Sequence, residues 1–151
     1  MKIAANLLQE IVAHARENPR IECCGVVAVW PPGAESAGDA SAARTATRVY
    51  RAENVHASAL KFEIAPMELY ALNETIEREG WEIGAIYHSH VRSEPYPSQT
   101  DIGFAAGWPG LEWIIVGLAS GEQPKVRSYV IDGGRVRDAP IDQIDAGEPA
   151  S

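Results

Sequence analysis

Two histidines, a serine and an aspartate stand close together in the stretch YHSHVRSEPYPSQTD, residues 87–101. His88 and His90 are two positions apart, so in a β-strand their imidazoles point to the same face of the sheet. Two imidazoles on one face can bind one metal ion. Ser98 and Asp101 are three positions apart, which places them on one side of a helix. If the proline-containing loop between the two pairs folds back, Asp101 supplies a third ligand.

Two imidazoles and one carboxylate are typical of a catalytic zinc site. His88, His90 and Asp101 would leave one tetrahedral position open for water, whereas structural zinc is fully enclosed by protein ligands. Iron and manganese accept the same ligand types. Water at such a site needs a group that carries its proton to the leaving group. Glu22 is the candidate, because it is an acid in the otherwise apolar stretch IECCGVVAVW and a buried carboxylate requires a partner.

Each of these residues also has an ordinary structural interpretation. Ser98 followed by Asp101 is what a helix N-terminus uses, a serine cap and an acid in the first turn. His88 and His90 could form the polar end of a strand, and Glu22 could be a solvated strand start. The joint pattern HxH(x7)SxxD favours the metal site, because ordinary residue usage seldom produces it by chance.

The stretches around these residues alternate between helix and strand patterns. Apolar residues recur at helical spacing over 7–15, and a second helix is expected from Pro66 to Arg78, closed by Gly80. The last two strands form a hairpin through the turn sequence DGG. Strands are expected at 21–30, 44–52, 60–64, 81–90, 111–120, 125–132 and 134–139, a short helix at 98–106 and a loop at 31–42. This order predicts an α/β protein with a mixed central β-sheet flanked by helices.

Length and charge limit what kind of protein carries the site. A chain of 151 residues fits one domain, which we expect at 1–139, with a flexible polar tail at 140–151. Asp and Glu number 21 against 13 Lys and Arg, a net charge of -8 without a basic stripe, so nucleic acid is not an expected partner. No apolar run is long enough to cross a bilayer, and the start does not resemble a signal peptide, so no membrane partner is expected.

The two cysteines, Cys23 and Cys24, are sequence neighbours. A disulfide between sequence neighbours would be strained and would hold no segments together, so both cysteines are expected to be free thiols. Free thiols are typical of a reducing compartment, so a cytoplasmic location is expected. Cys24 shares a strand face with Glu22, but a thiolate nucleophile needs a histidine base, and the favoured role is that of a small buried hydrophobe. His56 is expected in a surface loop.

The combined pattern resembles the JAMM signature of the MPN+ metallopeptidases. His88, His90, Ser98 and Asp101 match it in spacing, with Glu22 upstream in ECCGVVAV. IYHSH, YPSQTD and ECCG are especially similar to the small bacterial members that act on ubiquitin-like sulfur-carrier proteins. The resemblance implies a single MPN (JAMM, cytidine-deaminase-like) domain. It implies that the two histidines and the aspartate bind Zn²⁺. Glu22 would act as general base and then general acid, and Ser98 would stabilise the oxyanion.

The same resemblance implies a reaction and a partner. The reaction is hydrolysis of a peptide or isopeptide bond after the C-terminal Gly-Gly of a ubiquitin-like sulfur-carrier protein, with release of cysteine or deconjugation from lysine. The alternative is a non-catalytic MPN-type scaffold or interaction module. A zinc deaminase does not fit, because the chain lacks HxE and PCxxC motifs. The identity of the carrier, the leaving group and the oligomeric state, with a homodimer as one option, stay open.

Overall fold

The computed structural model describes residues 1–32, 44–119 and 123–144. Most elements expected from the sequence are present, with two short strands in addition. In chain order they are β1 (Lys2–Ala4), α1 (Ala5–Glu17), β2 (Cys24–Val29), β3 (Ala46–Ala52), α2 (Pro66–Arg78), β4 (Glu82–His90), α3 (Gln99–Ala105), β5 (Glu112–Gly117), β6 (Lys125–Asp132), β7 (Arg135–Ala139) and β8 (Asp142–Ile144).

A six-stranded mixed sheet forms the centre of the molecule, in the order β3-β2-β4-β5-β6-β7. β4 runs antiparallel to β2 and parallel to β5, and the other neighbours in this sheet are antiparallel. The register places Cys24 of β2 and Ile115 of β5 on either side of His88. The strand with the two histidines is therefore an interior strand, fixed on both edges by hydrogen bonds.

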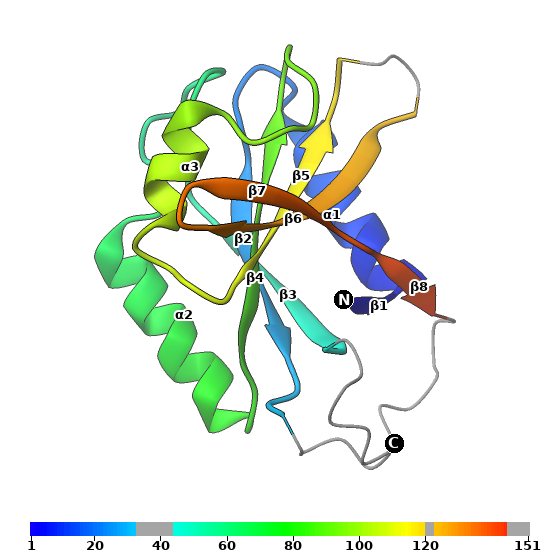
Figure 1. Ribbon diagram of the computed structural model, residues 1–151, viewed down its shortest axis with the longest axis vertical. Helices are drawn as coiled ribbons and strands as arrows, with labels where there is room; N and C mark the ends of the chain where they lie inside the picture. The colour runs from blue at the N-terminus through cyan, green and yellow to red at the C-terminus, as the bar shows by residue number, and fades with distance from the viewer. Residues whose placement is uncertain (33–43, 120–122, 145–151) are drawn as a thin grey trace.

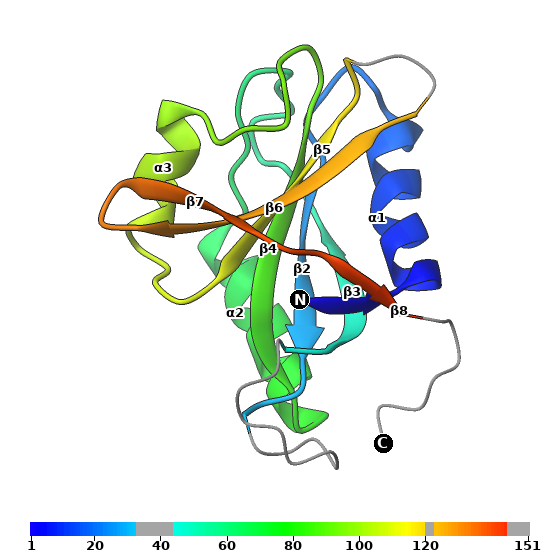
Figure 2. The same cartoon turned by 45° about the vertical axis from the view of Figure 1, so that its right-hand side comes forward.

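Helices cover both faces of the sheet (Figures 1 and 2). α1 packs on one face, where its Ile11 and Ala15 join a buried cluster with Val27 and Tyr87. α2 and α3 lie on the other side of the sheet, where Ile86 and other apolar residues form a second buried cluster. Because side chains alternate along β4, the histidines face the same side as Ile86 and Tyr87 faces α1. The predicted mixed α/β architecture is confirmed.

The element ends follow the local chemistry expected for them. α2 begins at Pro66 and is followed by Gly80, which has φ of +83°. Gly133 and Gly134, between β6 and β7, have φ of +57° and +79°. Positive φ is readily adopted by glycine because it has no Cβ, so the predicted helix end and hairpin turn are confirmed at these positions.

The structure differs from the sequence prediction at two places. Residues 60–64 do not form a strand; the segment makes only an isolated bridge between Asn54 and Ile64. Asp142–Ile144, placed by the sequence in a polar tail, forms β8 and pairs in parallel with β1. Such a short, mostly polar strand carries little sequence signal, because its pairing depends on a partner near the other end of the chain. Most of the predicted loop at 31–42, and the tail after residue 144, lie outside the described residues.

None of the helices in the described parts of the chain is long and apolar enough to cross a membrane.

Candidate active site

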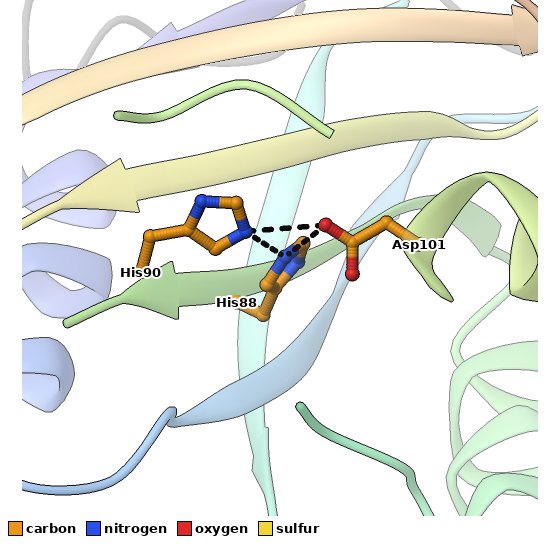
Figure 3. Close-up of side chains that lie close together, drawn as sticks. All are labelled: His88, His90 and Asp101. Carbon is orange, nitrogen blue, oxygen red and sulfur yellow. Dashed lines mark hydrogen bonds and ion pairs between the residues drawn. The ribbon is translucent and has the colours of Figure 1, made fainter. Parts of the chain in front are cut away.

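The donor atoms of His88, His90 and Asp101 converge on one point (Figure 3). Nε2 of each histidine lies 3.1 Å from Oδ2 of Asp101, and the two Nε2 atoms are 3.1 Å apart. All three side chains are buried, His88 completely, so neither histidine is a solvated strand end. The prediction that the loop folds back and brings Asp101 to the histidines is confirmed geometrically.

Asp101 reaches this position from the first turn of α3. Ser98 is the N-cap: its Oγ accepts from the backbone N–H of Asp101 at 3.0 Å, and its backbone N–H donates to Oδ2 of Asp101 at 2.9 Å. This is a capping box in which an aspartate takes the place of the usual glutamate or glutamine. The capping interpretation is therefore confirmed. The carboxylate oxygen that accepts from the cap also faces the histidines, as the metal-site prediction requires.

The donor set fits a metal cation. Oxygen and nitrogen ligands bind zinc at about 2.0–2.2 Å, so two ligands of a tetrahedral site lie about 3.3–3.6 Å apart, a little more than the 3.1 Å observed here. Nδ1 of His90 lies 2.7 Å from the carbonyl oxygen of Glu94, an acceptor only, so Nδ1 carries a proton. In neutral His90, Nε2 then has a lone pair facing the Asp101 carboxylate, so the 3.1 Å contact needs either a metal ion between the two atoms or a proton on Nε2.

Electrostatics keeps Asp101 ionised and acts in opposite directions on the two histidines. Burial raises the pKa of Asp101, but hydrogen bonds to His88 and His90 outweigh it and hold the pKa well below its usual range. Burial lowers the pKa of His88 against the opposing effect of Asp101, whereas burial of His90 is outweighed by hydrogen bonds to Asp101 and Glu94, which raise its pKa. Asp101 and His88 are therefore in the forms that bind a divalent metal, an ionised carboxylate and a neutral imidazole, and His90 would lose a proton on metal binding.

Glu22 is buried close to the triad, two positions before the start of β2. Its side chain is 4% exposed, and its Oε1 has no hydrogen-bond partner. Burial raises its pKa to about 8, while the charges of His90 and Asp101 act on it in opposite directions. The interpretation of Glu22 as a solvated strand start is wrong. A buried carboxylate with one oxygen unbonded is poised to take up and release a proton, which is what a general base and acid requires.

The two cysteines and the other two histidines do not belong to this triad. Cys23 and Cys24 are free and buried, and burial raises their pKa values to about 11 and 12, so both are protonated thiols at neutral pH. This fits the expected role as small hydrophobes. His56 pairs with Glu63 near the surface, and His14 bonds through Nδ1 to the hydroxyl of Tyr87 at 2.7 Å.

Three residues that the sequence did not single out support the site. Phe62 stacks on the imidazole of His88, with ring centroids 4.3 Å apart. Tyr129 of β6 donates from its hydroxyl to the carbonyl oxygen of Pro95, in the loop between β4 and α3. Asn54 is a buried amide that bonds to the backbone of Glu22. None of the three follows a periodic pattern or motif, so only the folded chain reveals them.

Tyr129→Phe is expected to weaken zinc binding up to about tenfold, at the low end of the loss seen for outer-shell partners. The hydroxyl anchors Pro95, whose neighbour Glu94 supplies the carbonyl that orients His90. Isothermal titration with zinc measures the effect, with Tyr96→Phe as matched control, because Tyr96 packs on the Tyr129 ring without a hydroxyl bond to Pro95. Equal zinc affinity of the two variants would show that the anchor has no influence on the metal site.

The mixed sheet with helices on both faces, the histidine pair on an interior strand and the capped aspartate opposite it define a JAMM-type metallopeptidase. The chain belongs to the family of prokaryotic homologs of the JAB domain, whose model matches residues 4–132. The predicted family and fold class are thereby confirmed.

Named relatives are similar over most of the chain. A desampylase of Haloferax volcanii is 38% identical over 120 residues, 76% of this chain and 78% of the relative. A CysO-cysteine peptidase of Mycobacterium tuberculosis is 29% identical over 143 residues, 95% of this chain and 90% of the relative. Among solved structures, a JAB1/MPN domain protein from Archaeoglobus fulgidus superimposes with a TM-score of 0.60 at 18% identity, covering 96% of this chain and all of that one, which shows the shared fold.

Proposed function

We propose that this protein is a zinc-dependent peptidase that hydrolyses the peptide or isopeptide bond after the C-terminal Gly-Gly of a ubiquitin-like sulfur-carrier protein. The observation that carries the proposal is the convergence of His88, His90 and Asp101 beside the buried carboxylate of Glu22, whose Oε1 has no hydrogen-bond partner. The names of the relatives support it, since one is a desampylase and another a CysO-cysteine peptidase.

In the proposed mechanism His88, His90 and Asp101 would hold zinc, and the chemistry that zinc would supply is a lowered pKa of water, to about 7, and polarisation of the scissile carbonyl. Glu22 accepts the proton that the attacking water loses and delivers it to the leaving amine. The raised pKa of Glu22 allows it to hold that proton between the two transfers. Ser98 uses a lone pair of Oγ in the capping box, so its O–H proton is free to donate to the developing oxyanion.

The proposed partner needs a docking surface near the site, and α2 offers one. A groove of about 420 Å³ lies between α2 and α3, and its lining includes Leu69, Tyr70 and Trp108. Met67 and Tyr70 on α2 are largely exposed to solvent. Exposed apolar residues beside a groove are typical of protein-binding surfaces.

A cytoplasmic location and a homodimer stay predictions.

Removal of zinc is expected to abolish hydrolysis, and its return to restore it. The test is a sulfur-carrier protein joined through Gly-Gly to cysteine or to the lysine of a reporter peptide, incubated with purified protein before and after chelation. Metal analysis of the protein as purified should find about one zinc per chain. His56→Ala is the matched control: it removes a histidine that is bonded to Glu63 rather than to the triad, and it should keep zinc and activity. Protein that holds no zinc and cleaves neither substrate would leave the non-catalytic scaffold as the function.

A further inference from the structure

Glu22 lies outside the regular strand pairing that fixes the histidines. β2 begins at Cys24, opposite His88, and Cys23 is still held by Ser89 of β4, through bonds of 2.9 and 3.1 Å. The backbone of Glu22 is held from the loop that follows β3. Its N–H donates to the carbonyl oxygen of Ser58 at 2.8 Å, and its carbonyl oxygen accepts from Nδ2 of Asn54 at 3.0 Å.

Asn54 uses the full hydrogen-bonding capacity of its side chain in this loop. Nδ2 donates to the carbonyl oxygens of Glu22 and Lys61, both at 3.0 Å, and Oδ1 accepts from the backbone N–H groups of His56 and Glu63 at 3.1 and 3.2 Å. A carboxamide has two N–H donors and two acceptor lone pairs, so all four positions are filled. The side chain is 7% exposed, and a saturated network this deeply buried is rigid.

The same loop touches the metal site on a second side. Phe62, between Lys61 and Glu63, stacks on His88, with 22° between the ring planes. Asn54 therefore joins the backbone of Glu22 to the segment that packs against a proposed zinc ligand. The polar side chain has no hydrogen bond to any of the three triad residues, so its influence on the metal itself is indirect.

We propose that Asn54 is a positioning residue, which holds Glu22 at the place where its carboxylate serves the triad. The inference rests on the proposed function, in which Glu22 transfers the proton. The backbone carbonyl that Asn54 binds and the carboxylate belong to the same residue, so a shift of the Glu22 backbone also shifts its carboxylate. A displacement of about 1 Å at a catalytic group can lower turnover about 100-fold. Asn54 thus determines the rate through Glu22 without contacting the reacting atoms.

Asn54→Asp tests this directly, because the substitution keeps the two bonds that Oδ1 accepts and removes the two bonds that Nδ2 donates. One carboxylate oxygen still accepts from His56 and Glu63, but the other faces the carbonyl oxygens of Glu22 and Lys61 with no proton to donate. We expect kcat to fall about 10- to 100-fold, with KM and zinc affinity within about twofold of the parent.

A measurement on the metal-free protein gives a readout independent of activity. Loss of the bond from Asn54 to the carbonyl oxygen of Glu22 should loosen this segment and with it the bond from the Glu22 N–H to Ser58. Amide hydrogen exchange at Glu22 should then rise at least about tenfold, while exchange at Val26 and Ile86 in the sheet stays unchanged. Asn18→Asp is the matched control: it makes the same chemical change at an exposed asparagine that accepts from the N–H of Arg20, and it should leave both readouts at the parent values.

Unchanged kcat and unchanged exchange at Glu22 in Asn54→Asp would overturn the inference, with the zinc peptidase intact. Asn54→Ala, which removes both halves without adding a charge, should reproduce the kinetic loss. If neither variant folds, Asn54 is a folding residue and the inference fails. A parent protein without zinc or hydrolysis would instead defeat the proposed function, and the exchange at Glu22 would still report whether Asn54 holds this segment.

Discussion

Glu22→Gln retains zinc and loses turnover, with kcat lower by about 10²- to 10⁴-fold, the range that general acid and base catalysis contributes. The metal ligands are untouched by the change, and glutamine has the same shape as glutamate but cannot carry the proton. Glu22 is 4% exposed, so an uncharged side chain is also tolerated in its place without loss of solvation. Zinc content by metal analysis and steady-state kinetics on the carrier conjugate measure the two halves of the expectation.

A matched control separates this effect from a general loss of negative charge near the site. Glu53 is exposed at the end of β3, and its backbone N–H is bonded to Glu68. Glu53→Gln removes the same charge close to Asn54 and should leave kcat within about twofold of the parent. Near-normal turnover in Glu22→Gln would refute the assignment of Glu22 as the base.

Asp101→Ala loses zinc and activity together. Oδ2 of Asp101 lies 3.1 Å from both histidine nitrogens, so its removal takes away one of three protein ligands. Zinc affinity should fall by more than about 100-fold, beyond the loss typical of an outer-shell partner. One half of the capping box is lost as well, because the N–H of Ser98 loses its acceptor, at a cost of about 1 kcal/mol. The bond from the backbone N–H of residue 101 to Oγ of Ser98 remains. Zinc titration, kinetics and thermal unfolding of the metal-free protein measure the three effects.

Two further variants separate the cap from the metal ligand. Asp101→Asn keeps an oxygen that can accept from the N–H of Ser98 but removes the charge, so the cap should survive while zinc affinity falls. Ser98→Ala removes the hydroxyl cap and leaves the carboxylate, so zinc should stay bound while turnover falls. A fully metallated and active Asp101→Ala protein would show that the aspartate is a cap alone.

Much of the fold and of the triad can be read from residue types and spacing. The alternation of side chains along a strand is enough to predict that His88 and His90 share a face. Helix periodicity and capping rules are enough to predict that Ser98 and Asp101 begin α3, and β-branched apolar stretches predict the interior strands of the sheet. These are local properties, so the sequence around each residue contains the information.

The sequence failed where backbone groups find partners far along the chain. The aromatic and β-branched stretch at 60–64 predicts a strand, but the backbone groups of Lys61 and Glu63 bond to the side chain of Asn54 instead. β8 is short and carries charge, and it forms because β1 lies beside it. No local sequence pattern predicts either outcome, since both depend on which segments contact each other in the folded chain.

The sequence alone determined the residue types of the proposed triad, the pairing of the histidines on one face and the family to which the signature points. Only the tertiary structure decided that Ser98 and Asp101 serve the cap and the triad at once, because one carboxylate oxygen faces both groups. The tertiary structure also decided that Glu22 is buried and held by Asn54. The physical reason is that burial and hydrogen-bond geometry arise from contacts between distant segments, and no spacing within one segment specifies them.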